Sequence, residues 1–268
     1  TFEEYVGQDR IRDNILVYTR AARERHEPLD HCLFLGPPGL GKTTLAHIIA
    51  GEMHARIHTT SGPALDKPET LVAILSAMER GDILFIDEIH RLNAVVEEFL
   101  YPAMEDFVVD LPAGPADEAG KVPTTRIAIA PFTLVGATTR TGLITSPMRD
   151  RFGIVERLQY YSPEELARIV ARSSRILRVQ VDSEAAIEMG RRARGTPRIA
   201  NRLLRRIRDF TTVEGHGMIT RERASEALER LEVDAFGLDA FDRSILSTLI
   251  EKFEGQPVGV DSLAVALS

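Results

Sequence analysis

Residues 36–43 read Gly36-Pro-Pro-Gly-Leu-Gly-Lys-Thr43, between the apolar run Cys32-Leu-Phe-Leu35 and a run with helical spacing. A strand, this G-x-x-x-x-G-K-[ST] spacing and a helix together are the signature of a phosphate-binding P-loop. Glycines let the backbone N–H groups wrap a phosphate chain, and the helix N-terminus adds partial positive charge. Lys42 is expected to reach the β- and γ-phosphates, and the Thr43 hydroxyl to bind Mg²⁺.

Working outward, the first half of the chain alternates short apolar runs with helical patterns, which is typical of a parallel sheet covered by helices. Ile11, Ile15, Tyr18 and Ala22 fall at helical spacing and predict a helix before the first strand. The expected strands are 32–35, 56–60, 83–86, 133–137 and 154–158, and the expected helices between them are about 41–53, 69–80 and 94–104.

One stretch interrupts this order. The runs Phe107–Leu111 and Arg126–Ala130 are strand-like and flank a turn-rich segment at 112–125. They predict a β-hairpin inserted into the α/β domain over about 107–131. A plain surface excursion is the alternative.

After Tyr161 the pattern becomes helical. Ser162-Pro-Glu-Glu165 combines an N-cap serine, a proline at the first helical position and a capping-box glutamate. Further helices are expected near Asp182, after Pro197 and at Thr220, with no strand between them. One more amphipathic helix follows from about residue 238, marked by Phe241, Ile245, Leu246, Leu249 and Ile250.

The predicted organisation is an α/β domain at 1–161, an all-helical domain at 162–236 and the start of a small third domain at 237–268. The chain begins without Met, and its C-terminal apolar pattern has no cap. Both ends are therefore expected to continue in a longer protein.

Two carboxylates follow the apolar strand at 83–86. Asp87 and Glu88 emerge at its C-terminal end, where open α/β sheets bind their ligands. Asp87 is expected to hold Mg²⁺, through water, and Glu88 to act as general base toward the attacking water. Beside a P-loop, this pair indicates nucleotide hydrolysis.

Such an enzyme also needs a detector for the γ-phosphate and a cation for transition-state charge. Thr139, which follows another expected strand, is a candidate for the first. Arg149 and Arg151, in Ser146-Pro-Met-Arg-Asp-Arg-Phe152, and Arg198, in Gly195-Thr-Pro-Arg198, are candidates for the second.

Together these motifs resemble an AAA+ ATPase and, more narrowly, the RuvB family of Holliday junction branch-migration motors. The resemblance covers essentially the whole chain. Beyond the P-loop and the Asp-Glu strand end, it is carried by Leu100-Tyr-Pro-Ala-Met-Glu-Asp106, Phe132-Thr-Leu-Val-Gly-Ala-Thr-Thr-Arg140 and Arg194-Gly-Thr-Pro-Arg-Ile-Ala-Asn-Arg202.

The resemblance implies specific roles. Thr139 would be the first sensor, Arg151 the arginine finger donated to a neighbouring subunit, and Arg198 the second sensor in a helical lid. With Lys42, Asp87 and Glu88 these are the expected catalytic residues. The residues expected to bind ATP or ADP are Gly36, Pro37, Pro38, Gly39, Leu40, Gly41, Lys42, Thr43, Thr44, Glu105, Asp106, Phe107, Tyr161 and Arg198, and those expected to bind Mg²⁺ are Thr43 and Asp87.

The same resemblance implies a homo-hexameric ring on duplex DNA and at Holliday junctions, with RuvA docked on the hairpin and RuvC in the resolving complex. Two features depart from the family pattern. The hairpin tip at 112–125 is longer and richer in Pro, Ala and acidic residues, and the C-terminal winged-helix domain is truncated at 237–268. No DNA-contact residue is assigned there.

Composition limits the other functions. Lys plus Arg is 33 and Asp plus Glu is 40, a net charge of −7, which disfavours binding of nucleic acid by the whole surface. The basic run at 191–208 could form a DNA-binding face, but its spacing puts the arginines all round a helix pair rather than on one stripe, and acidic neighbours could neutralise several. A single cysteine, Cys32, and the lack of a long apolar run predict a cytoplasmic protein without a membrane span.

Two alternatives remain at this stage. A clamp-loader-type AAA+ ATPase would share the P-loop and the finger, but not the hairpin or the Gly195-Thr-Pro-Arg198 motif. A nucleotide-gated assembly module would bind ATP without hydrolysing it, and Glu88 argues against it because such a switch needs no base.

Overall fold

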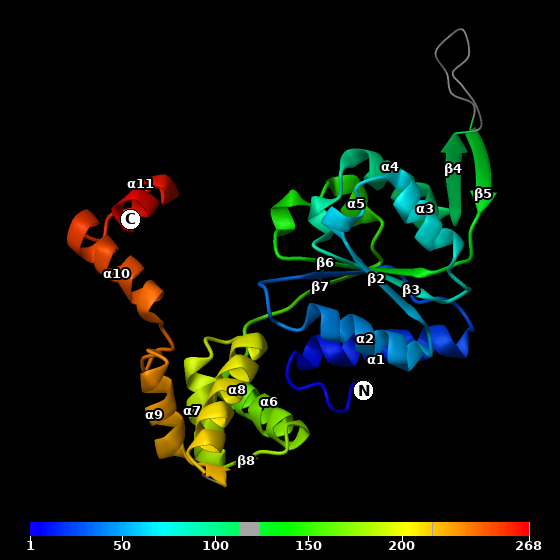
Figure 1. Ribbon diagram of the computed structural model, residues 1–268. Coiled ribbons are helices and arrows are strands. Elements are labelled where there is room, and N and C mark those ends of the chain that lie inside the picture. The colour runs from blue at the N-terminus through cyan, green and yellow to red at the C-terminus, as the bar shows by residue number, and fades with distance from the viewer. Residues whose placement is uncertain (113–123, 216, 268) are drawn as a thin grey trace. The chain divides into compact units, whose positions relative to one another are not determined.

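The computed structural model describes residues 1–112, 124–215 and 217–267, which form two compact units, Thr1–Gln159 and Tyr160–Ser268 (Figure 1). The described part of the second unit ends at residue 267. No helix among the described residues combines the length and the apolar character that crossing a membrane requires.

The first unit is built on a five-stranded parallel sheet in the order β2-β3-β6-β1-β7. The inner strands β1, β3 and β6 are almost wholly buried, as continuous apolar runs predict for strands covered on both faces. The edge strand β7 instead alternates buried and exposed residues. The bounds are β1 Cys32–Leu35, β2 Ile57–Ser61, β3 Ile83–Asp87, β6 Thr133–Thr138 and β7 Ile154–Arg157.

Helices cover both faces of this sheet. In Figure 1, α1 and α2 lie on one face, and α3, α4 and α5 lie on the other. Apolar side chains of α3 and α4 pack with those of the central strands, with Phe132 and Leu134 fully buried among them. The bounds are α1 Asp9–Glu24, α2 Lys42–Met53, α3 Pro68–Ser76, α4 Ala94–Glu105 and α5 Ser146–Asp150, with 3-10 turns at Gly62–Ala64, Ile89–Arg91 and Thr141–Leu143.

The predicted helix before the first strand is confirmed as α1, although Tyr18 on it is 41% exposed and its neighbour Thr19 is buried, with the Thr19 hydroxyl donating to the Ile15 carbonyl at 2.9 Å. One predicted boundary was wrong. Helix α3 ends at Ser76 rather than near residue 80. The chain turns there, and the Asp82 carboxylate accepts a hydrogen bond from the Glu79 N–H at 2.9 Å.

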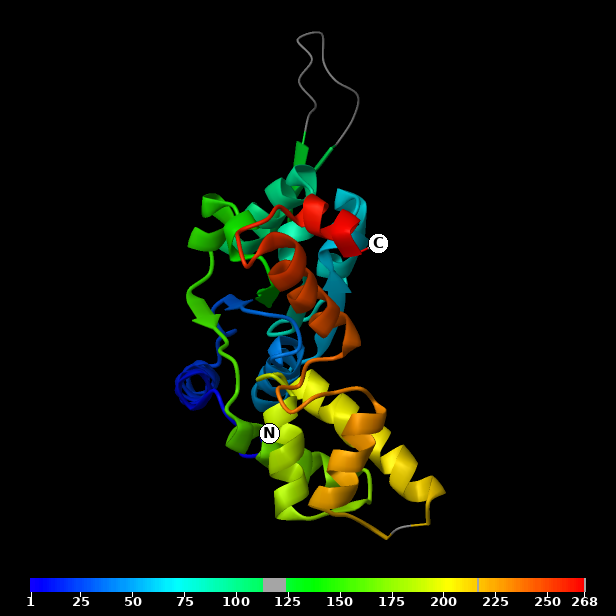
Figure 2. The ribbon, with the colours of Figure 1, turned by 90° about the vertical axis from the view of Figure 1, so that its left-hand side faces the viewer.

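The inserted hairpin is present. Strands β4 (Val108–Pro112) and β5 (Thr124–Ala128) are antiparallel, and Asp110 and Arg126 face each other in an ion pair of 3.0 Å. Figures 1 and 2 show both strands extending away from the α/β unit. The expected tip at 112–125 lies mostly outside the described residues, which omit 113–123.

The second unit is helical, and its helices begin at the predicted caps. Ser162 and Glu165 form a capping box, with hydrogen bonds of 3.2 and 2.7 Å. The Asp182 carboxylate caps the next helix at 2.6 Å, and Thr220 caps a later one. The bounds are α6 Pro163–Ile176, α7 Ser183–Arg192, α8 Pro197–Val213 and α9 Arg221–Arg230.

The expectation of no strand among these helices was wrong. Residues Gln180–Val181 (β8) and Met218–Ile219 (β9) pair in parallel, two residues each. Strands this short carry no periodic pattern, so nothing in the sequence indicates them.

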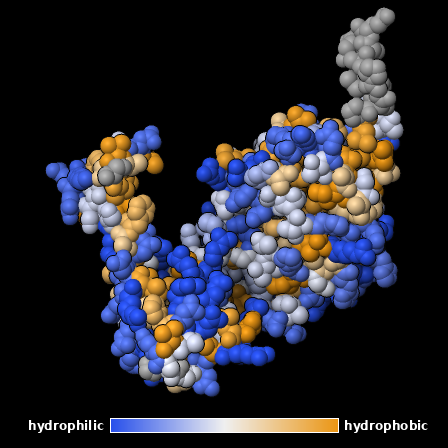
Figure 3. Space-filling model, viewed as in Figure 1, coloured by the Kyte–Doolittle hydropathy of each residue, from blue (hydrophilic) through white to orange (hydrophobic). Residues whose placement is uncertain are grey.

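Two more helices, α10 (Ala240–Phe253) and α11 (Val260–Leu267), follow α9 in the second unit. Arg194 joins α10 to the preceding helices through an ion pair with Asp242 at 2.5 Å. Apolar side chains on these helices are exposed, including Phe241, Ile250, Val260 and Val265. Orange surface is visible over this part of the chain in Figure 3.

Candidate functional site

The P-loop joins β1 to α2 through three glycines with positive φ. Gly36, Gly39 and Gly41 have φ of 138°, 82° and 102°, a conformation that side chains disfavour. A Cβ on Gly36 would also lie 2.8 Å from the Leu158 carbonyl oxygen. Helix α2 then begins without a side-chain cap, which leaves its N-terminus to an anionic ligand. The loop therefore fits a phosphate chain.

Lys42 is held within this loop. Its side chain is buried, and Nζ donates to the carbonyl oxygens of Gly36 and Pro37 at 2.7 and 2.9 Å. These acceptors hold the ammonium close to the expected phosphates. Thr43 and Thr44 follow in the first turn of α2 and are exposed, while Leu40 is buried below the loop.

The P-loop lies beside the ends of β3 and β6. The Gly36 N–H donates to the Thr138 carbonyl at 3.2 Å, which joins the loop to the end of β6. Asp87 ends β3, and its carboxylate accepts from the Glu88 N–H at 3.0 Å. Glu88 itself has φ of 48°, a strained left-handed conformation of the kind that concentrates at functional sites.

The Glu88 carboxylate is fixed by two side chains. The Thr139 hydroxyl donates to it at 3.0 to 3.1 Å, and the Thr139 N–H at 3.3 Å. His90 Nδ1 lies 3.1 Å from Glu88 Oε2 and 2.8 Å from the Thr138 hydroxyl. A hollow of about 510 Å³ opens beside them, lined by Glu88, His90, Arg91, Thr139, Arg140 and Leu143.

Sequence reasoning missed His90 and Thr138 as members of this site. His90 is 6% exposed, so its contacts with Glu88 and Thr138 are internal. The only available signal was its place in Asp87-Glu-Ile-His90, since no metal-ligand spacing surrounds it.

The oxygen donors fit Mg²⁺. Among the described residues, no group of three or more His, Cys, Asp or Glu side chains could hold a metal. Mg²⁺ at nucleotide sites typically uses one or two protein oxygens together with phosphates and water. Asp87 and the Thr43 hydroxyl supply that chemistry.

Arg151 lies at the opposite ends of the strands from the P-loop. With Asp30, His31, Phe107 and Gly153 it lines a hollow of about 520 Å³ beside residues that precede β1 and β7, whereas the P-loop follows β1. The two ends of β1 are roughly 13 Å apart, because the strand has four residues at the usual rise per residue. The structure therefore divides the predicted site residues of this unit into two groups.

The second group includes the segment after α4. The Arg151 guanidinium pairs with Glu105 at 3.1 Å, and Phe107 packs edge-on against Phe132 and His31. His31 Nε2 lies 3.0 Å from the Met104 carbonyl, and Nδ1 accepts from the Leu134 N–H at 2.8 Å. Burial lowers the pKa of His31, so the ring is neutral and bridges α4 to β6.

The remaining candidates belong to neither group. Arg149 donates to the Thr141 carbonyl at 3.2 Å. In the second unit, Arg198 is exposed in the first turn of α8, and Tyr161 is buried with its N–H on the Gly195 carbonyl at 3.0 Å. Cys32 is fully buried, and burial raises the pKa of its thiol, as expected for a core residue.

The basic run at 191–208 is partly paired with acidic side chains. Arg192 is buried against Glu188 at 2.7 Å, and Arg194 pairs with Asp242. Arg206 and Arg208 both pair with Asp209. Three carboxylates thus pair with four of the arginines of this run.

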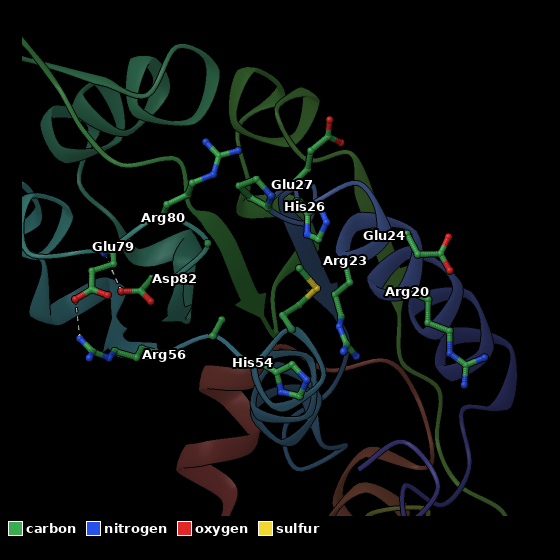
Figure 4. A pocket seen from close by; sticks show the side chains of 14 residues that line it. Arg20, Arg23, Glu24, His26, Glu27, His54, Arg56, Glu79, Arg80 and Asp82 are labelled. Carbon is green, nitrogen blue, oxygen red and sulfur yellow. Dashed lines mark hydrogen bonds and ion pairs between the residues drawn. The ribbon is translucent and has the colours of Figure 1, made fainter.

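A further hollow, of about 800 Å³, lies where α1 and α2 end and before β2 and β3 begin (Figure 4). Its charges are mixed and partly paired: Arg56 contacts Glu79 at 3.1 Å. The pKa of Asp82 is lowered although burial opposes it, because the Glu79 N–H and His58 donate to its carboxylate. None of the predicted nucleotide residues lines this hollow.

Comparison with known proteins gives matches over the whole chain. Residues 1–158 match the family described as the Holliday junction DNA helicase RuvB P-loop domain. Residues 161–234 match the RuvB AAA lid domain, and 235–268 match the RuvB C-terminal winged helix domain. These matches exclude the clamp-loader alternative.

Individual relatives agree. The Holliday junction branch migration complex subunit RuvB of Myxococcus xanthus is 58% identical over 269 residues, covering 100% of this chain and 77% of the relative. The structure of a point mutant of Thermotoga maritima RuvB has a TM-score of 0.90 at 48% identity, over 100% of this chain and 84% of that one. The structure of the Thermotoga maritima RuvB Holliday junction branch migration motor has a TM-score of 0.86 at 48% identity, over 98% and 82%.

With an ATP-binding P-loop, a helical lid and the beginning of a winged helix in family order, the chain belongs to the RuvB family of AAA+ ATPases, the motors of Holliday junction branch migration.

Proposed function

We propose that this chain hydrolyses ATP with Mg²⁺ in a homo-hexameric ring and uses the energy to drive branch migration of Holliday junctions. The separation of Arg151 from the P-loop across the sheet supports a ring most directly. An arginine finger at one end of the strands can complete a nucleotide site at the other end only when a second copy of the chain supplies the finger.

Each residue of the P-loop group has a proposed role. The loop residues Gly36–Thr44 and the Lys42 ammonium bind the phosphates, and Thr43 and Asp87 hold Mg²⁺, which offsets phosphate charge. Glu88 accepts a proton from the attacking water. The Thr139 hydroxyl holds the Glu88 carboxylate in place through a hydrogen bond of 3.0 Å. Thr139 thereby links the base to the γ-phosphate as the first sensor.

The remaining roles cross between subunits or domains. Arg151 stabilises transition-state charge at a neighbour's nucleotide, and the segment 105–107, which pairs with it through Glu105, faces that same nucleotide. Tyr161 and Arg198 belong to the lid at 162–236 or its hinge and report nucleotide state. The α/β domain at 1–161 then carries the hydrolysis, and 237–268 begins the DNA-binding domain.

RuvA is the proposed partner of the hairpin β4–β5, with RuvC joining the complex at the junction in the cytoplasm. Ile127 on β5 is apolar and 41% exposed, so it is accessible to a partner. The departure of the tip at 112–125 from the family pattern makes this the part of the proposal that most needs a test.

The test is a titration of the chain against RuvA of the same source, beside a variant that lacks Val109–Ile127. We expect binding by the intact chain and none by the deletion, with ATP hydrolysis retained by both. Lys42→Ala is the control, because it should bind RuvA without turning ATP over. Equal binding by the deletion would remove the hairpin as the docking site, and no binding by the intact chain would remove RuvA coupling.

A further inference from the structure

The short helix α5, which leads into Arg151, rests on one face of α4. Glu97, Tyr101 and Glu105 lie four residues apart along α4, so their side chains share that face. At the start of α5, the Thr145 hydroxyl donates to the Glu97 carboxylate. At the other end, Arg151 contacts Tyr101 and Glu105. A helix of five residues does not hold its own position, so these contacts set it.

The Arg151 guanidinium lies over the Tyr101 ring on this face. Its Cζ is 4.1 Å from the centroid of the Tyr101 ring, a cation–π contact. Nη2 lies 3.1 Å from Glu105 Oε1, and Nη1 donates to the Pro147 carbonyl at 2.7 Å. Nε is buried and has no hydrogen-bond partner among the described residues. The side chain is only 21% exposed, so its orientation is constrained before any ligand arrives.

The Tyr101 ring is itself fixed. Its hydroxyl donates to the Glu97 carboxylate and lies 3.4 Å from the Thr145 hydroxyl. Burial and the hydrogen bond to Glu97 raise the pKa of Tyr101, so the hydroxyl remains a donor. Glu97 therefore binds both the Tyr101 side chain and the start of α5.

We propose that Tyr101 is a positioning residue for Arg151. The Tyr101 ring holds the Arg151 guanidinium in the orientation from which it enters the nucleotide site of a neighbouring subunit. This inference rests on the proposed action of Arg151 between subunits. Glu105 holds the same guanidinium through a partly exposed ion pair, which a neighbour's phosphates can replace. The ring contact competes with no phosphate and so persists through that exchange.

The test compares Tyr101→Leu with Tyr101→Phe in steady-state ATP hydrolysis by the full chain. Tyr101→Leu removes the ring, and we expect kcat to fall roughly 10- to 100-fold, the cost of a small displacement of a reacting group, with KM for ATP little changed. Tyr101→Phe keeps the ring and should retain most of the turnover. Wild-type kcat in Tyr101→Leu, or an equal loss in both variants, would overturn the ring's role.

A mixing experiment separates positioning from a folding defect. Tyr101→Leu subunits keep their own P-loop, so Lys42→Ala subunits, whose fingers are intact, should restore turnover to them. Arg151→Ala subunits should not restore it, because they lack the same group. Failure of Lys42→Ala to restore turnover overturns the inference. If Arg151→Ala alone turns over normally, the proposed finger fails first. If turnover by Arg151→Ala is impaired while turnover by Tyr101→Leu is not, only the proposed role of Tyr101 fails.

Discussion

A Cβ on Gly62 would lie 2.5 Å from the carbonyl oxygen of Glu88. Gly62 begins the 3-10 turn after β2, and the backbone of the candidate base packs directly on it. No real Cβ tolerates that distance, so a side chain here must move the Glu88 backbone.

Gly62→Ala should therefore lower kcat for ATP hydrolysis by roughly 10-fold or more, because small misplacements of a catalytic group are costly. Overpacking should also destabilise the fold by about 1–3 kcal/mol. Gly51→Ala is the matched control, since nothing lies within 4 Å of its Cβ and it sits inside α2. It should keep wild-type kcat and gain about 0.5–1 kcal/mol. Equal kcat in the two variants would contradict the packing argument.

Glu88→Gln should bind ATP normally and hydrolyse it about 10²- to 10⁴-fold more slowly, because an amide cannot accept the proton of the attacking water. The amide oxygen can still accept the Thr139 hydrogen bond, so the site keeps its geometry. Nucleotide affinity from a titration and the single-turnover rate check the two halves separately. Hydrolysis at the wild-type rate would remove Glu88 as the base.

The buried ring of His31 predicts a pH effect on stability. Because the folded pKa is lowered, the unfolded chain binds a proton first as the pH falls below about 6.5. The free energy of unfolding should thus be independent of His31 above that pH and fall below it, by at most about 1.4 kcal/mol per pH unit. Urea unfolding at pH 7.5 and 5.5 measures this. His31→Gln, which still offers a donor and an acceptor, should lose less stability between these pH values, and an equal loss in both proteins would show that His31 is not the source.

The sheet and the P-loop could be predicted because their signals are local. Buried runs such as Cys32–Leu35 are apolar throughout, and the glycines of the loop stand at fixed spacing. The end of α3 and the burial of Thr19 were missed because each depends on one hydrogen bond between a side chain and the backbone. The Asp82 carboxylate accepts from the Glu79 N–H, and the Thr19 hydroxyl donates to the Ile15 carbonyl.

Candidate site residues could be named from the sequence, but their division into two groups could not. The sequence assigned Arg151 and Lys42 to one mechanism, yet only the structure shows that they lie at opposite ends of the strands. The contact between Arg151 and Tyr101 could not be predicted either, because the two residues are distant in sequence. The spacing of Tyr101 and its neighbours on α4 is that of an ordinary helix surface.

The central claim is that a complete site needs two subunits, and mixing Arg151→Ala with Lys42→Ala tests it most directly. Each variant alone should hydrolyse ATP poorly, the first for want of a finger and the second for want of nucleotide. In rings mixed at equal amounts, about a quarter of the sites would join an intact P-loop to an intact neighbouring Arg151. Turnover well above the sum of the separate variants is the predicted result. Turnover no greater than that sum, in rings shown to exchange subunits, would contradict a shared site.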